Sequence, residues 1–151
     1  MSTESVPPQL RGAHHLAFSV RDLDRSIAFY CDVLGAVLVR PPFDGESSAF
    51  SGRMAIVALG ATGLDLFEHA ANESEPFDPA RTGLDHVGFA VASAEDLQSW
   101  VDWLEACDIA HSGIRDITFG GTTLGAMFDF RDPDGIQLEF LFRDTAISAR
   151  A

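Results

Sequence analysis

The chain has 151 residues, a length typical of one domain. It carries ten arginines, no lysine and 23 carboxylates, for a formal net charge of −13. This balance argues against nucleic acid and anionic membrane surfaces as partners, because both attract cationic proteins. Without lysine, Schiff-base catalysis and a lysine-bearing phosphate loop are excluded.

Residues 1–11 are polar and proline-bearing, and we interpret them as a flexible arm rather than a signal peptide. No window approaches eighteen uninterrupted apolar residues, so no membrane span is expected. Cys31 and Cys107 fall within expected helices and outside any Cys-x-x-Cys motif, so we interpret them as reduced. Together these features favour a cytoplasmic protein.

The first half begins with an expected strand from His15 to Val20. Asp22 then precedes apolar residues at helical spacing, which predicts a helix that ends at Gly35. Further strands are expected at 36–40, 54–59 and 64–68, with an irregular connection at 41–53 and a hairpin turn at 60–63. This half is strand, helix and three strands.

The same order returns after a polar stretch at 69–82, which we interpret as the linker between halves 12–68 and 83–142. A strand is expected at 85–92, a helix after Ser93, and strands at 110–114, 123–130 and 136–142, followed by a tail at 143–151. The sequence therefore predicts a single α+β domain over 12–142, in which two βαβββ repeats form paired curved mixed sheets around a shared cavity.

The duplication is clearest at the two histidine strands. The segments that start at His15 and His86 match without a gap at a separation of 86 − 15 = 71 residues. Side chains alternate along a strand, so each histidine shares its face with small residues, Ala17 in one copy and Gly88 in the other. Such a face leaves room for a ligand. His14 has the opposite parity and is expected to pack or face solvent.

Two imidazoles and a carboxylate are a recurring set of metal ligands. Glu139 lies on the last strand of the second half, with parity opposite to the apolar residues, and is therefore expected on the cavity face. Asp65 is its counterpart in the first half. Arg53 and Arg115 are interpreted either as contacts for an acidic substrate or as surface charges.

Four motifs in this order resemble the vicinal oxygen chelate superfamily over residues 12–142. They are the two histidine strands, the segment 22–30 with its helix end at Leu34-Gly35, and the turn Asp132-Pro133-Asp134-Gly135 four residues before Glu139. The superfamily includes glyoxalase I, methylmalonyl-CoA epimerase, fosfomycin-modifying enzymes, extradiol dioxygenases and bleomycin-resistance proteins.

The resemblance implies a divalent ion, held by His15, His86 and Glu139, that chelates two neighbouring substrate oxygens. Asp65 stands where glyoxalase I has a second glutamate ligand; being shorter, it would bind through water or act as a base. Imidazole and carboxylate ligands suit zinc, iron, manganese, nickel or cobalt. The resemblance also implies a homodimer, with the site inside each chain or swapped between chains.

Asp129 stands ten residues before Glu139, where ring-cleaving dioxygenases of the superfamily carry a tyrosine. Ala71 stands fifteen residues before His86, where they carry a histidine. Both departures weaken a dioxygenase assignment. Asp129 is expected on the cavity face, where a carboxylate can move a proton.

The favoured function is a metal-dependent lyase or isomerase, glyoxalase-like or epimerase-like, acting on a small, mostly apolar molecule with vicinal oxygens. Its expected catalytic residues are Asp65, Asp129 and Glu139. The alternatives are a small-molecule binding protein, metal-free or metal-assisted, like the bleomycin-resistance proteins, and an extradiol-type dioxygenase.

Overall fold

The computed structural model describes residues 7, 9–10, 12–47 and 50–143. Most of the expected N-terminal arm and nearly all of the expected tail lie outside these residues. The first half contains β1 (His15–Ser19), α1 (Leu23–Ala28), the π-helical turn η1 (Phe29–Val33), β2 (Val37–Glu46), β3 (Ser51–Leu59) and β4 (Thr62–His69). The second contains β5 (His86–Ala90), α2 (Ala94–Ala106), β6 (Arg115–Phe119), β7 (Thr122–Arg131) and β8 (Gln137–Arg143).

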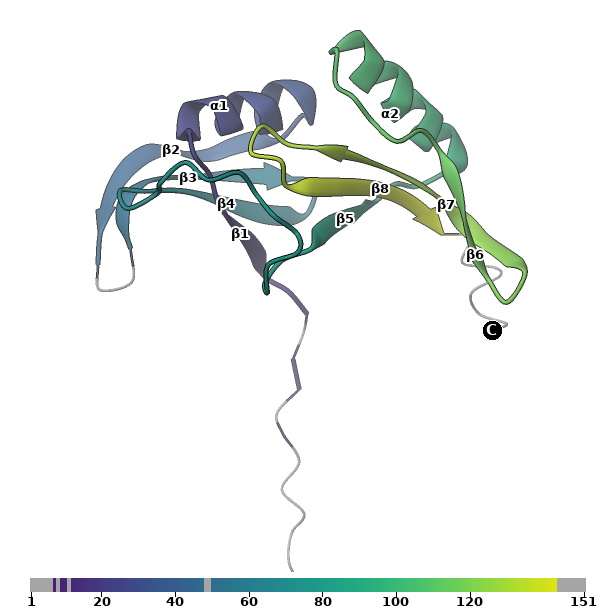
Figure 1. The fold of residues 1–151 in the computed structure, drawn as a ribbon, viewed down its shortest axis with the longest axis horizontal. Helices are drawn as coiled ribbons and strands as arrows, with labels where there is room; N and C mark the ends of the chain where they lie inside the picture. The colour runs from purple at the N-terminus through teal and green to yellow at the C-terminus, as the bar shows by residue number, and fades with distance from the viewer. Residues whose placement is uncertain (1–6, 8, 11, 48–49, 144–151) are drawn as a thin grey trace, which may run out of the picture.

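Each half forms its own four-stranded mixed sheet. The strand orders are β1-β4-β3-β2 and β5-β8-β7-β6, so corresponding strands occupy corresponding places. Figure 1 shows the sheets as an arch, with both helices on its outer side and β1 and β5 near its middle. The predicted fold class, two βαβββ repeats forming paired curved sheets, is confirmed.

The helices begin where the sequence predicts. The Asp22 carboxylate accepts a hydrogen bond from the Arg25 amide at 3.0 Å, and the Ser93 hydroxyl accepts one from the Asp96 amide at 3.1 Å. Both bonds satisfy amides that the first helical turn leaves without partners. The first helix ends before Gly35, whose φ of 71° favours glycine.

Each helix covers the apolar face of its own sheet. Leu97, Val101 and Leu104 of α2 are buried in the core with aromatic residues of β7 and β8. In the first half, Leu23 and Tyr30 of the helical segment are buried in the same core cluster as Phe18 of β1 and Leu66 of β4. Because successive strand side chains alternate, the histidines and their small neighbours are left on the uncovered faces.

The strands that differ most from their expected bounds are β2 and β6. Pro41 and Pro42 suggested an irregular connection, but β2 continues to Glu46. It lies at the sheet edge, and its pairing with β3 shifts register between Leu38 and Arg40 and again between Arg40 and Phe43. An edge strand with bulges tolerates proline, because the missing amide breaks no inner ladder bond.

The strand expected at 110–114 is wrong. Only an isolated bridge between His111 and Phe130 forms there, and β6 begins at Arg115. Gly113 adopts a φ of 75°, which interrupts an extended strand. The segment 110–114 does lie beside β7, at the bridge between His111 and Phe130, but regular strand pairing begins only at Arg115, one residue after the expected range.

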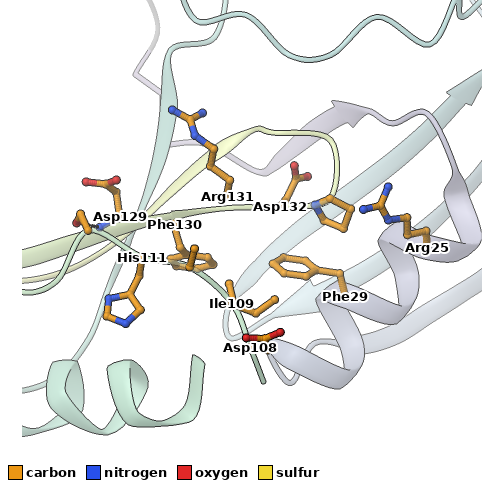
Figure 2. A pocket seen from close by; sticks show the side chains of 12 residues that line it. Arg25, Phe29, Asp108, Ile109, His111, Asp129, Phe130, Arg131 and Asp132 are labelled. Atoms are coloured by element: carbon orange, nitrogen blue, oxygen red, sulfur yellow. Dashed lines mark hydrogen bonds between the residues drawn. The ribbon is translucent and has the colours of Figure 1, made fainter. Parts of the chain in front are cut away.

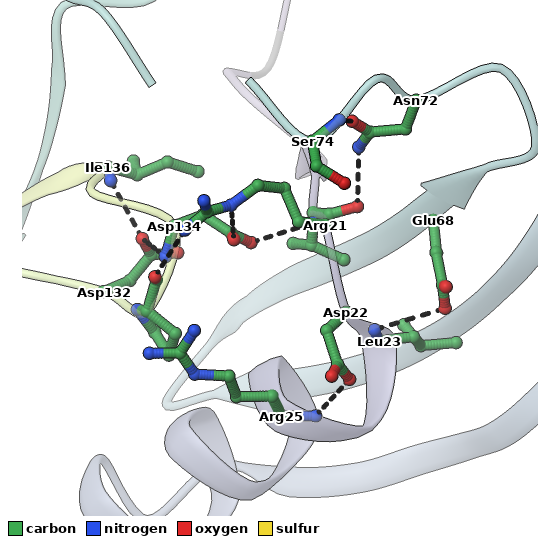
Figure 3. A network of polar contacts seen from close by, with 12 residues as sticks. Arg21, Asp22, Leu23, Arg25, Glu68, Asn72, Ser74, Asp132, Asp134 and Ile136 are labelled. Carbon is green, nitrogen blue, oxygen red and sulfur yellow. Dashed lines mark hydrogen bonds and ion pairs between the residues drawn. The ribbon is translucent and has the colours of Figure 1, made fainter. Parts of the chain in front are cut away.

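A polar network joins the two halves (Figure 3). Arg21, just beyond β1, donates from its Nε to Asp134 Oδ1 at 2.7 Å and from its Nη2 to the Pro133 carbonyl at 3.1 Å. Asp134 also accepts from the Arg21 amide at 3.1 Å. The turn that leads into β8 is therefore fixed to the end of β1.

Neither helix in the described part of the chain has the length and apolar composition needed to span a membrane.

Candidate metal centre

Asp65 and Glu139 occupy the same position in the two sheets. In the parallel pairing of β1 with β4, Asp65 lies opposite Ala17. In the parallel pairing of β5 with β8, Glu139 lies opposite Gly88. Each carboxylate therefore shares a face with the histidine that opens the neighbouring strand, as the alternation predicts.

This register places each imidazole beside a carboxylate. His15 Nε2 lies 3.8 Å from Asp65 Oδ2, and His86 Nε2 lies 3.6 Å from Glu139 Oε2. Adjacent ligands of a tetrahedral ion bound at about 2.1 Å are separated by roughly 3.4 Å. Both pairs are close to the spacing of two ligands on one ion. The histidines are about half exposed, whereas only 11% of the Glu139 side chain is exposed.

The three expected ligands do not meet at one point within the described part of the chain. No group of three or more histidine, cysteine, aspartate or glutamate side chains suited to a metal ion is found there. The molecule instead holds two half-sites, His15 with Asp65 and His86 with Glu139. A common ion would require the half-sites to close on each other, and the ligand assignment stays a prediction.

Each histidine also has a contact on its other ring nitrogen. Asp85 Oδ1 lies 2.6 Å from His86 Nδ1, and this hydrogen bond, together with the nearby charge of Glu139, raises the pKa of His86 above its ordinary value. In the first half, His14 Nδ1 lies 3.0 Å from His15 Nδ1. His14 was expected to pack or face solvent, and neither Asp85 nor His14 was assigned a role at the site.

Asp129 lies on the same face as Glu139, as expected. The two residues are directly opposite each other in the antiparallel pairing of β7 with β8. Arg115 Nη1 lies 2.6 Å from Asp129 Oδ1 and donates to Ser112 Oγ at 2.7 Å. Ser112 Oγ also accepts from the Asp129 amide at 3.0 Å. Asp129 is therefore held in place beside the second half-site.

The other arginine considered for substrate contact has a different role. Arg53 donates to both oxygens of Asp24, at the start of α1, and to Glu68 of β4 at 3.3 Å. Glu68 in turn accepts from the Leu23 amide (Figure 3). These contacts tie β3 and β4 to α1, away from the half-sites, because Glu68 has the opposite parity to Asp65.

The floor beside the second half-site depends on a residue without a side chain. A Cβ atom at Gly88 would lie 2.9 Å from Leu141 Cδ2, so a larger residue would displace Leu141. Ala17 occupies the corresponding position of the first sheet. In the second half, the Leu141 side chain therefore occupies the space that Gly88 leaves on this face.

The family model for the Glyoxalase/Bleomycin resistance protein/Dioxygenase superfamily matches residues 12–140. The chain belongs to this superfamily. A glyoxylase/bleomycin resistance protein/dioxygenase domain from Frankia sp. EAN1pec is similar in structure, with a TM-score of 0.78 and 30% identity, and the match covers 90% of this chain and 94% of that one.

Two relatives with named activities are also similar across most of their length. The metallothiol transferase FosB of Staphylococcus epidermidis is 29% identical over 134 residues, which are 87% of this chain and 81% of the relative. The 2-epi-5-epi-valiolone epimerase of an Actinomyces species is 29% identical over an alignment of 162 positions, gaps included, which covers 93% of this chain and 84% of the relative. Superfamily members thus carry out different reactions on this fold.

A cavity of about 460 Å³ lies elsewhere on this superfamily fold, between α1, the segment after α2 and the end of β7. Figure 2 shows Arg25 and Phe29 on one side of it and His111 and Phe130 on the other. Of the expected site residues, Asp129 alone contributes to its lining. None of the four half-site residues lines this cavity, which is therefore separate from the half-sites.

Proposed function

We propose that the protein is a divalent-metal-dependent enzyme of this superfamily, of the lyase or isomerase type. Its substrate would be a small molecule with two neighbouring oxygens. The observation that carries the proposal is the pair of half-sites, in which an imidazole and a carboxylate lie 3.8 and 3.6 Å apart at matching positions of two sheets.

In this proposal His15, His86 and Glu139 hold the ion, and Asp65 binds it through water or acts as a base. The half-sites lie on the sheets whose innermost strands, β1 and β5, are near the middle of the arch in Figure 1. We therefore expect them to close on a single ion within one chain. A bound ion would supply a Lewis acid that stabilises negative charge on the substrate oxygens.

The chain supplies the remaining chemistry. Glu139 is largely shielded from water, and Gln137 Nε2 donates to its Oε1 at 3.2 Å, which leaves Oε2 directed toward His86. Asp129 is opposite Glu139 and is about one-quarter exposed, so it can exchange a proton with a substrate on this face. Arg115 holds Asp129 in position, while Gly88 leaves room for the Leu141 side chain beside the half-site.

The relatives support both parts of this proposal. The name metallothiol transferase indicates metal-dependent chemistry in a protein 29% identical to this chain. The name epimerase indicates a change of configuration at a carbon, for which a positioned proton carrier such as Asp65 or Asp129 is suited. We expect a homodimer, by analogy with the superfamily.

A second candidate function is small-molecule binding without catalysis, as in bleomycin-resistance proteins. It is favoured by the separation of the half-sites, since the described residues hold no three-ligand group. In that case the open face between the histidine strands would bind its ligand without an ion. The two candidates differ in metal content.

Elemental analysis of protein purified without chelators distinguishes them. The enzyme proposal predicts about one divalent ion per chain, and a loss of most of it in both His15→Ala and Glu139→Ala. His69→Ala is the matched control, because His69 stacks on Phe67 outside both half-sites. If the two ligand variants retain as much metal as the parent protein, the ligand assignment is wrong. A metal-free parent that binds small molecules favours the second candidate.

A further inference from the structure

The residue before each proposed ligand histidine contacts that histidine at Nδ1. Asp85 Oδ1 lies 2.6 Å from His86 Nδ1, and His14 Nδ1 lies 3.0 Å from His15 Nδ1. Asp85 and His14 are separated by 85 − 14 = 71 residues, the same offset as the histidines themselves. The duplicated fold thus puts two chemically different groups in one equivalent position.

The two groups act differently on the imidazole. An ionised carboxylate only accepts hydrogen bonds, so the contact with Asp85 requires a proton on His86 Nδ1. In the neutral ring, the lone pair is then on Nε2, the nitrogen that lies 3.6 Å from Glu139. His14 is itself an imidazole that either donates or accepts, so its contact leaves the His15 tautomer undetermined.

We propose that Asp85 is a positioning residue, which fixes the ring orientation and tautomer of His86 so that Nε2 is ready to bind a divalent cation. A histidine ligand whose other nitrogen donates to a carboxylate is also a more basic ligand. His86 is therefore expected to be the stronger of the two histidine ligands of the ion, and His15 the weaker. The inference rests on the proposed function, since it assumes that His86 binds an ion.

The exposure of Asp85 limits the size of its effect. Its side chain is 72% exposed, and solvent screens a hydrogen-bonded ion pair at such a position. Removal of an outer carboxylate typically lowers metal affinity by about 10- to 100-fold, and we expect the lower end of that range here. Asp85→Asn, which keeps an acceptor oxygen without the charge, should have a smaller effect than Asp85→Ala.

The test measures Zn²⁺ affinity at pH 8 by competition with a chromophoric chelator, using the full chain. Asp85→Ala should raise the Zn²⁺ Kd about tenfold. The matched control is Asp116→Ala, which removes the side chain of another exposed aspartate, on the opposite face of β6 from Arg115. The control should keep the parental Kd.

Nitrogen-15 NMR of the metal-free protein measures the tautomer of His86 and so tests the positioning role directly. At pH 8 the parental His86 should carry its proton on Nδ1, and Asp85→Ala should shift the population toward the Nε2–H tautomer. A merely structural role for Asp85 predicts no tautomer change in a variant that remains folded by circular dichroism.

The first half-site offers a gain-of-function variant. His14→Asp would give His15 the partner that His86 already has, so the Zn²⁺ affinity should increase. An unchanged affinity in both Asp85→Ala and His14→Asp would overturn the inference. If His86→Ala loses Zn²⁺ in the same assay, the proposed function still stands; if His86→Ala binds Zn²⁺ as tightly as the parent, the proposed function itself fails.

Discussion

The Tyr30 hydroxyl donates to Asp132 Oδ2 at 3.0 Å and so connects the helical segment of the first half to the turn before β8 in the second. Both side chains are buried. Asp132 Oδ1 accepts in addition from the amides of Asp134 and Ile136, at 2.9 and 2.8 Å. The turn that leads to Glu139 is thus organised around one buried carboxylate.

Tyr30→Phe tests this connection. The variant keeps the aromatic packing but leaves one oxygen of a buried carboxylate without its donor, which typically costs about 1–3 kcal/mol. We expect the free energy of unfolding in urea to fall by that amount. An unchanged urea midpoint, with an unchanged slope, would contradict the role of this bond.

Asp132 should also give the protein a characteristic pH dependence. Burial raises the pKa of Asp132 above its ordinary value of 3.8. Between that value and the raised pKa, the folded state binds more protons than the unfolded state, so stability falls as the pH rises through this window. In Asp132→Asn, which keeps an acceptor for the Ile136 amide, this contribution should be absent.

The measurement is the urea unfolding free energy from pH 4 to 7 for the parent and Asp132→Asn. The difference between the two proteins should move in favour of the variant as the pH increases. A difference that is constant with pH would show that Asp132 has the same pKa in both states.

Arg21→Ala should weaken the junction between the halves. The Arg21–Asp134 pair joins a side chain that is 30% exposed to one that is 7% exposed. Its loss should cost about 2 kcal/mol, between the values typical of surface and buried pairs. Arg25→Ala, at an exposed position of α1, is the control and should change stability little. Equal effects of the two substitutions in thermal unfolding would contradict this role.

A mixing experiment tests whether the metal site lies inside one chain. His15→Ala and Glu139→Ala proteins are unfolded together, refolded as a mixture and assayed for bound metal. We expect no recovery, because each chain lacks one ligand of its own site. Recovery of metal in the mixture, relative to each variant refolded alone, would show that the site is shared between subunits.

The sequence predicted the fold, and the face of each sheet that carries the histidines and carboxylates, because both depend on alternation along strands. Parity placed Glu139 and Asp65 on the uncovered faces, and the register of β8 and β4 confirms that position. Proline composition gave the wrong end for β2, since the bulges that accommodate Pro41 and Pro42 depend on the partner strand. Local patterns do not contain that information.

The contacts around the site were less predictable than the site residues. The Arg115–Asp129 pair joins residues 14 positions apart, through a β6–β7 register that begins one residue after the expected strand. Asp85 did carry a signal, an acidic residue directly before a proposed ligand histidine. Its meaning depends on a side-chain rotamer that brings the carboxylate to Nδ1.

The most direct test of the metal centre is an anomalous difference map from crystals grown with Mn²⁺ or Zn²⁺. The account predicts one strong peak per site, within bonding distance of His15 Nε2, His86 Nε2 and a Glu139 oxygen. A fully occupied peak bound to other residues, or an ion held by either histidine without Glu139, would contradict it.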